Sequence, residues 1–183
     1  MKCTLNDIVS EYIEKNTGGF YRPVAVGKYG IRQRSDIYKK ELAKDYSKNK
    51  VIRNNTMIIG MGYTQIDFGV LWEDEIYSVS PAYHTFNINT SLVYSKYFDY
   101  LLQAKNKTYT KKYMIASARQ GKTVNLKDLL KEQIEIPCFE IQNGITKNID
   151  LIKVLISKEK KRLNLLDELI KSRFVGWEAF LCA

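Results

Sequence analysis

Hydrophobic and polar positions follow different periods in different parts of this 183-residue chain. From Val51 to Ile88, short apolar runs rich in β-branched and aromatic residues are broken by Gly or Asn, which predicts a series of strands. Residues 91–105 return to helical spacing, and residues 131–137 read as a last strand that ends at Pro137. These patterns predict a mixed α/β (α+β) globular domain over residues 1–138.

Three further elements are expected before Val51. An amphipathic turn or helix is predicted from Leu5 to about Lys15, where Thr17-Gly18-Gly19 would stop it. Residues 21–31 read as one strand with a proline near its start, and residues 36–46 have the spacing of a second helix.

The last quarter of the chain differs in kind, because its apolar residues recur at alternating spacings of four and three. This heptad pattern predicts a coiled-coil helix over residues 139–183, with only Glu159 as a polar interruption. A second apolar line widens the face, at Leu151, Leu155, Leu165 and Leu169. We expect this helix to pair with another long helix, although it could instead fold back on its own domain. The expected dimerisation residues are Ile145, Ile149, Ile152, Ile156, Leu163, Leu166 and Ile170.

The composition narrows the class of protein. The net charge of +9 favours an acidic partner, either nucleic acid or an anionic membrane surface. There is no run of eighteen apolar residues, and the three cysteines show no C-x-x-C pairing. His84 is the only histidine, so a histidine-rich metal site is excluded. We expect a reduced, cytoplasmic protein with no membrane span, no metal and no cofactor.

The positive charge is concentrated in two segments. Residues 22–53 hold ten Lys and Arg against three acidic residues, and residues 104–131 hold eight against one. Residues 59–100, which lie between them, carry one Lys and five acidic residues. If the fold brings the two basic segments together, they form one positive surface for an anionic polymer. The alternative is an ordinary solvated, lysine-rich surface.

Side chains that can read bases are interleaved with these charges, including Tyr29, Gln33, Tyr109 and Tyr113. Arg and Gln can form paired hydrogen bonds with guanine and adenine edges, whereas Lys mostly contacts phosphate. Two further candidates, Tyr63 and Gln65, follow a pair of glycines in "GMGYTQ". This stretch could equally be an ordinary hairpin turn. The candidates for base readout are Arg32, Arg34, Tyr63, Gln65, Arg119 and Gln120. The candidates for phosphate contact are Lys28, Lys111, Lys112 and Lys122.

The stretch "ASARQGKT" at residues 116–123 partly matches the phosphate-binding loop G-x-x-x-x-G-K-[ST], but Ala116 replaces its first glycine. Such a loop follows a buried apolar strand and opens a helix, whereas the residues before Ala116 are basic and mostly polar. We therefore interpret it as a basic loop suited to DNA phosphates. No catalytic constellation is present in the sequence.

The order of motifs resembles the specificity subunits of type I restriction–modification enzymes. The resemblance rests on "LNDI" near the start, "SPAY" at residues 80–83 and "VNLKDLLKEQIEIP" at residues 124–137. It continues with Gln142 before the long helix and with "KSRF" at residues 171–174 near its end. The pattern departs from the family at "PCFEIQ", where a second proline is more usual.

The resemblance implies a target-recognition domain that reads one half of a bipartite site in double-stranded DNA. It also implies that the helix acts as a spacer and docks the methyltransferase subunit, and through it the restriction subunit. Such subunits normally carry two recognition domains and two antiparallel helices, whereas this chain has one of each. We therefore expect a non-catalytic half-subunit that forms a homodimer through antiparallel helices. The alternatives are a truncated, non-functional specificity subunit and a small stand-alone nuclease or nucleotide-dependent enzyme.

Overall fold

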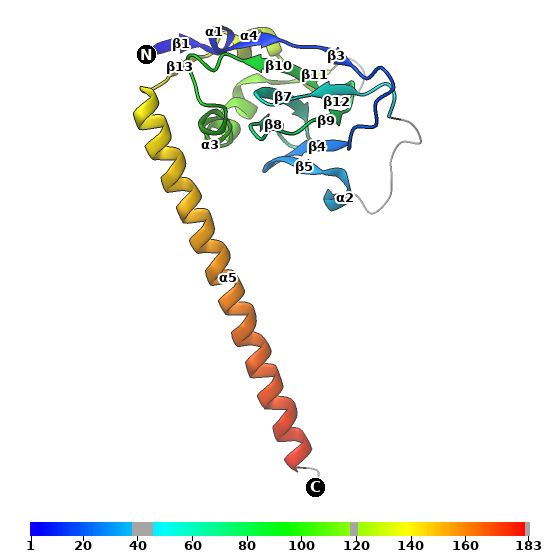
Figure 1. Ribbon diagram of the computed structural model, residues 1–183, viewed down its shortest axis with the longest axis vertical. Coiled ribbons are helices and arrows are strands. Elements are labelled where there is room, and N and C mark those ends of the chain that lie inside the picture. Colours follow the sequence, from blue (N-terminus) through cyan, green and yellow to red (C-terminus); the bar gives the residue numbers. More distant parts are fainter. Residues whose placement is uncertain (38–45, 118–120, 182–183) are drawn as a thin grey trace. The chain divides into compact units, whose positions relative to one another are not determined.

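The computed structural model describes residues 1–37, 46–117 and 121–181, without the side chains of residues 36–37 and 174–181. The chain divides into two compact units, Met1–Asn143 and Gly144–Ala183. The first unit includes the start of helix α5 (Phe139–Leu181), and the rest of that helix makes up the second (Figure 1). The first turn of the long helix therefore belongs with the globular part of the chain.

A four-stranded antiparallel sheet forms the centre of the first unit, in the order β2-β10-β7-β8. Its strands are β2 (Val9–Glu11), β10 (His84–Ile88), β7 (Thr56–Met61) and β8 (Ile66–Leu71). All six residues of β8 are buried, which explains its nearly continuous apolar sequence. The β-rich character predicted for residues 51–88 is confirmed.

Helix α3 (Ser95–Tyr113) covers β8 and bonds to its backbone. The Asn106 amide donates to the Ile66 carbonyl at 2.7 Å, and the Ile66 N–H donates to Thr110 Oγ1 at 3.1 Å. The Gln103 amide donates to the Phe68 carbonyl at 2.8 Å. Because an edge strand exposes unpaired backbone groups, these side chains take the place of a further strand beside β8. The apolar face of α3, including Tyr97, Phe98 and Leu102, enters the main core.

Two smaller antiparallel sheets pack against the central sheet. One contains β3 (Glu14–Lys15), β6 (Lys50–Ile52) and β9 (Tyr77–Val79), and the other is the hairpin of β4 (Val24–Gly27) and β5 (Gly30–Gln33). They share a second apolar cluster with the central sheet, made of Val24, Val26, Ile52, Ile58, Leu71, Tyr77 and Val79.

The N-terminal strand ties the start of the chain to the segment before α5. Strand β1 (Lys2–Thr4) pairs antiparallel with β13 (Gln133–Glu135), next to α1 (Leu5–Ile8) and α4 (Leu126–Leu130) (Figure 1). The Met1 ammonium donates to the Ile136 carbonyl at 2.7 Å. The predicted strand before Pro137 is confirmed.

The predicted helix from Leu5 to Lys15 is wrong beyond its first turn. Helix α1 ends at Ile8, and the chain continues at once as β2, which pairs with β10 through Val9 and Ile88. Pairing with a strand remote in sequence therefore overrides the local helical spacing. Residues 21–31 are also not one strand, because the chain reverses at Lys28 and Tyr29 to form the β4–β5 hairpin.

The helix predicted over residues 36–46 lies mostly outside the described residues. Helix α2 (Arg34–Ile37) covers only its beginning.

The long C-terminal helix is confirmed, since α5 runs without a break from Phe139 to Leu181. Gln142, which the sequence resemblance placed before this helix, lies inside its first turn. Among the described residues, no helix is both long and apolar enough to cross a membrane.

Candidate nucleic-acid interface

The β4–β5 hairpin presents two of the predicted contact residues, and a third begins the helix that follows it. Lys28 and Arg32 are exposed, and both lie beside the ring of Tyr29, which is itself exposed. The Lys28 ammonium is 5.4 Å from the centre of this ring and the Arg32 guanidinium carbon is 4.9 Å from it. Arg34 begins α2, with its guanidinium carbon 5.9 Å from the centre of the Tyr46 ring. The first basic segment therefore holds its cations beside aromatic rings.

The second basic segment contains another hairpin. Strand β11 (Met114–Ser117) pairs antiparallel with β12 (Gly121–Val124), and Ala116 lies opposite Lys122. A phosphate-binding loop joins a strand to a helix, so this antiparallel pairing agrees with the sequence argument against a nucleotide site. Lys122 is exposed. Arg119 and Gln120 lie outside the described residues.

Tyr63 and Gln65 stand in the turn between β7 and β8. Tyr63 is 96% exposed, whereas the Gln65 side chain is half-buried and donates to Asp67 Oδ1 at 2.9 Å. Burial raises the pKa of Asp67, although this hydrogen bond acts in the opposite direction. Tyr63 is thus free to reach a ligand, while Gln65 would first have to exchange its bond with Asp67.

The two predicted lysines at the end of α3 differ in their surroundings. Lys111 is exposed. The Lys112 ammonium pairs with the Glu132 carboxylate at 2.5 Å, and Glu132 also accepts from the Tyr113 hydroxyl. The hydrogen bond to Glu132 raises the pKa of Lys112 above its ordinary value. Partial burial raises the pKa of Glu132, but the bonds from Lys112 and Tyr113 outweigh it and leave that pKa lowered. Lys112 therefore already has an anionic partner in the fold.

Two tyrosines grouped with the base-reading side chains belong to the core instead. Tyr109 is 1% exposed and Tyr113 is 4% exposed, and their ring centres lie 6.0 Å apart. The basic helix that carries them buries one aromatic face against the sheet, which is why aromatic residues alternate with lysines there. Their predicted role at the surface is wrong.

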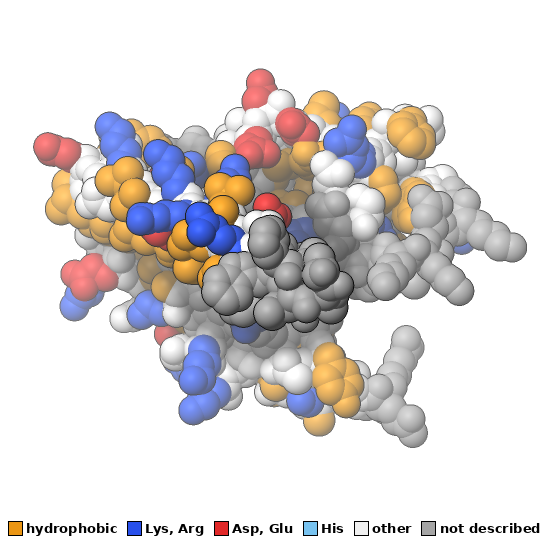
Figure 2. Space-filling view, turned by 90° about the horizontal axis from the view of Figure 1, so that it is seen from below, with side chains coloured by type: hydrophobic (Ala, Val, Ile, Leu, Met, Phe, Trp, Pro, Cys, Tyr) orange, Lys and Arg blue, Asp and Glu red, His pale blue; other side chains and the backbone are white. Residues whose placement is uncertain are grey.

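The predicted residues form two groups along α3. At the C-terminal end of α3, β11 contacts the helix and β12 contacts β7. In the same region Thr110 accepts a hydrogen bond from the Ile66 N–H, just after the turn that carries Tyr63. The β4–β5 hairpin instead approaches the middle of α3, where Gly30 lies near Gln103. Figure 2 shows basic and hydrophobic side chains intermingled on one face. The expected neighbourhood of Arg32 and Arg119 stays a prediction, because Arg119 lies outside the described residues.

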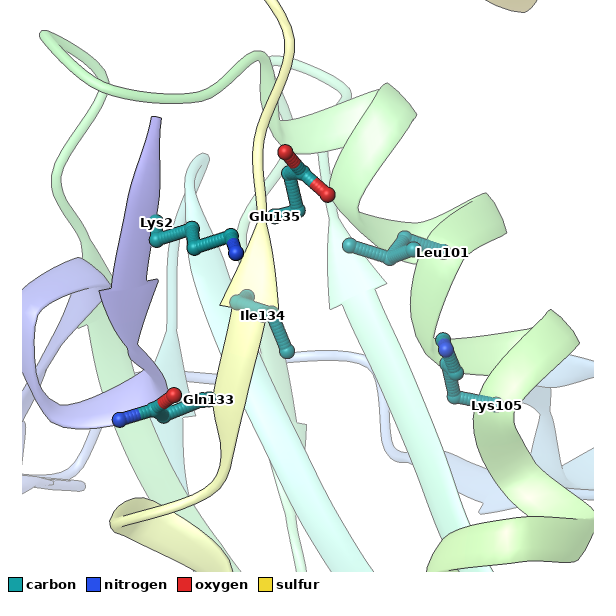
Figure 3. Close-up of a pocket in the computed structure, with 6 residues that line it drawn as sticks. All are labelled: Lys2, Leu101, Lys105, Gln133, Ile134 and Glu135. Atoms are coloured by element: carbon teal, nitrogen blue, oxygen red, sulfur yellow. The ribbon is translucent and has the colours of Figure 1, made fainter.

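A pocket of about 320 Å³ lies between β13 and α3 and contains none of the predicted contact residues (Figure 3). Leu101 points from α3 towards β13, the strand that carries Ile134. Its other lining residues are Lys2, Lys105, Gln133 and Glu135. With both signs of charge and an apolar floor, it does not select for an anion.

Helix α5 exposes a continuous apolar face. Along the predicted seam, Ile152 is 54% exposed, Ile156 50% and Leu163 60%. Leu165 and Leu169, on the second apolar line, are 65% and 55% exposed. Apolar side chains repeating in this way on one helix are typical of a surface that is buried by another helix.

Solved structures share this fold. A chain from a structural study of complex assembly and conformational transition of the type I R-M system aligns with a TM-score of 0.56 and 13% sequence identity. The alignment covers 88% of this chain and 40% of that chain. The HsdS subunit from Thermoanaerobacter tengcongensis aligns with a TM-score of 0.51 and 13% identity, over 88% of this chain and 39% of that subunit. The chain matches no protein-family model and no curated protein sequence.

The comparison establishes the fold class, a mixed domain followed by a long helix, as the sequence predicted. The chain spans about two fifths of the length of the two proteins that it matches.

Sequence reasoning named Tyr29 as a possible base reader but missed its contacts with Lys28 and Arg32. It also missed two carboxylates beside candidate residues, since Glu132 pairs with Lys112 and Asp67 accepts a hydrogen bond from Gln65. The Gln65–Asp67 contact could have been predicted from the sequence, because the two residues are two positions apart across a turn. The Lys112–Glu132 contact joins residues twenty positions apart, and no sequence pattern pointed to it.

Proposed function

We propose that this chain is a DNA-reading half-subunit of a type I restriction–modification system. In this proposal, the first unit reads one half of a bipartite site in double-stranded DNA. Helix α5 sets the spacing to the other half and docks the methyltransferase subunit, through which the restriction subunit joins.

The observation that carries the proposal is the fold shared with the HsdS subunit over 88% of the chain. Two features of the described residues support it independently. Each basic segment contains an antiparallel hairpin with exposed cations, Lys28 and Arg32 in the first and Lys122 in the second, and backbone phosphates are the common target of clustered Lys and Arg. The long helix presents an unpaired apolar face, as expected of a helix whose partner is another chain.

The residues differ in their suitability for contact with DNA. Lys28, Arg32, Lys111, Lys122 and Tyr63 are exposed and can approach DNA without rearrangement. Lys112 and Gln65 must give up a bond to a carboxylate first. Arg34, Arg119 and Gln120 complete the proposed contact set.

The apolar seam of α5 supports a two-fold dimer with antiparallel helices. Such a pair places one recognition domain at each end, which suits two half-sites separated by a fixed gap. Glu159 lies near the middle of the seam, within 3.8 Å of Arg162 on the same helix, so the polar interruption has a basic neighbour. The second apolar line, which includes Leu165, remains available to a methyltransferase subunit.

Binding to DNA should depend steeply on salt. A protein that neutralises about six phosphates loses roughly a thousandfold in affinity between 50 and 200 mM salt. We expect the purified chain to show such a fall in fluorescence anisotropy with a labelled duplex, and to leave that duplex uncut. Affinity that does not change over this range, or nuclease activity that copurifies with the chain, would contradict the proposal.

A further inference from the structure

The tip of the β4–β5 hairpin brings two cations to one exposed aromatic ring. Tyr29 is 67% exposed, with the Lys28 ammonium 5.4 Å and the Arg32 guanidinium carbon 4.9 Å from its ring centre. Cations within about 6 Å of an aromatic ring are attracted to its electron-rich face. The ring of Tyr29 is therefore in contact with two cations, one from the turn and one from β5.

The hairpin beneath this tip is firmly anchored. Lys28 and Tyr29 form a two-residue turn, and Gly30 follows at φ +86°, a backbone conformation that glycine adopts at little cost. Val24 and Val26 are buried, and Ile31 approaches β8 so closely that a β-carbon on Gly69 would lie 2.8 Å from its side chain. The two cations are thus carried on a base that has little freedom to move.

A buried carboxyl oxygen lies behind the tip of the hairpin. Asp99 approaches Gly30 from α3, with Oδ1 3.8 Å from the place of a Gly30 β-carbon. That oxygen is buried, so it faces away from solvent. The solvent side of the tip therefore carries positive charge, an aromatic ring and a phenolic hydroxyl.

We propose that Lys28, Tyr29 and Arg32 form a clamp for the phosphodiester backbone of duplex DNA. In this clamp Lys28 and Arg32 donate to phosphate oxygens, and Tyr29 is a positioning residue that holds both cations. Two cations beside one ring suit a phosphate, which accepts several charge-assisted hydrogen bonds, better than a base edge, which one Arg satisfies alone. The inference rests on the proposed binding to DNA, and it assigns Arg32 to the backbone rather than to a base.

The test compares variants of the full chain by fluorescence anisotropy, using a pool of random-sequence duplexes over a series of salt concentrations. Lys28→Ala and Arg32→Ala should each reduce the slope of log affinity against log salt by about 1. Tyr29→Ala should weaken binding to all sequences by about fivefold, the effect of losing two exposed cation–π contacts. Tyr29→Phe keeps the ring and should restore the wild-type affinity.

Lys161→Ala is the matched control, because it removes one exposed charge from α5 on the side opposite the apolar seam. Lys161→Ala should leave the slope of log affinity against log salt unchanged. Thermal melting should give the same midpoint for wild type and Tyr29→Ala, which separates positioning of the cations from a role in folding. Inorganic phosphate, added at constant ionic strength, should not displace the duplex if the clamp follows the polymer backbone.

Three results would overturn the clamp. Tyr29→Ala could bind like wild type, Arg32→Ala could alter preference at one base pair without changing the salt slope, or inorganic phosphate could displace the duplex. Each of these leaves the proposed binding to DNA intact. If the wild-type chain bound no duplex at all, the proposed function would fail and the clamp with it.

Discussion

At the scale of single residues, Gln142 connects three stretches of backbone with one side chain. It is fully buried, accepts from the Tyr94 N–H at 2.8 Å, and donates to the carbonyls of Leu92 and Pro137 at 3.2 and 3.0 Å. A buried polar group left without its partner costs much more than an exposed one. Gln142 therefore fixes the first turn of α5 within the globular unit.

Replacing this glutamine should be costly. Gln142→Leu removes the partner of three backbone groups and should lower the free energy of unfolding by about 1–3 kcal/mol. The neighbouring change Asn143→Leu, at an exposed position of the same helix, is the control and should have little effect. Urea denaturation of both variants measures the difference, and equal midpoints would show that the Gln142 contacts add nothing.

A second contact at the residue scale should appear in the pH dependence of stability. Arg53 donates to both oxygens of Glu14, at 2.9 and 2.7 Å, and the Tyr12 hydroxyl also donates to this carboxylate. Arg53 first, and then Tyr12, lower the pKa of Glu14 from its ordinary value of 4.5. A carboxylate whose pKa is lower in the folded state than in the unfolded state stabilises the fold. This stabilisation is complete at pH values above the unfolded-state pKa, and it is lost as the pH falls through the folded-state pKa.

Arg53→Ala should therefore reduce the loss of stability between neutral pH and pH 3. Thermal melts across this range should show a shallower decline for Arg53→Ala than for wild type. Lys15→Ala, which removes an exposed lysine from the same strand as Glu14, should keep the wild-type decline. If the melting temperature of all three proteins declines alike, the Arg53–Glu14 pair does not contribute to the pH dependence of stability.

At the scale of elements, the predictions that held were those with long, regular apolar patterns. Helix α5 carries a heptad repeat over nearly four periods, and β7 and β8 are rich in β-branched residues. The failures lie where a remote partner decides the structure. Val9 could continue α1 by its spacing, but it pairs with Ile88 instead. The β11–β12 hairpin has few buried residues, so its sequence resembles a polar loop.

The apolar seam of α5 gives a prediction at this scale. Burying a Leu or Ile side chain contributes about 1.5–3 kcal/mol, so charging two seam residues in each of two copies should weaken pairing by at least about a thousandfold. We expect Ile152→Asp/Leu163→Asp to sediment as a monomer at micromolar concentration, where wild type is a dimer. Val154→Asp, on the opposite side of the helix, should remain a dimer. A monomeric wild type would contradict the proposed pairing and would favour a truncated specificity subunit.

At the scale of the whole molecule, the sequence predicted a mixed domain followed by a long helix but not how the strands pair. The order β2-β10-β7-β8 joins strands from the start and the middle of the first unit, and no local pattern encodes this order. The same limit applies to the interface. Counting charged residues located the two basic segments, but only the fold shows that Tyr109 faces the core while Tyr29 faces solvent.

The central claim is that this chain reads half of a bipartite DNA site and works as a pair. Selection from a random-sequence duplex library, with the chain alone and with the proposed methyltransferase subunit, tests that claim most directly. We expect enrichment of two identical half-sites in inverted orientation, separated by a gap of constant length. Loss of the gap constraint in Ile152→Asp/Leu163→Asp would connect that gap to the helix. A library that shows no enrichment, or a single half-site with no second copy at a fixed distance, would contradict the claim.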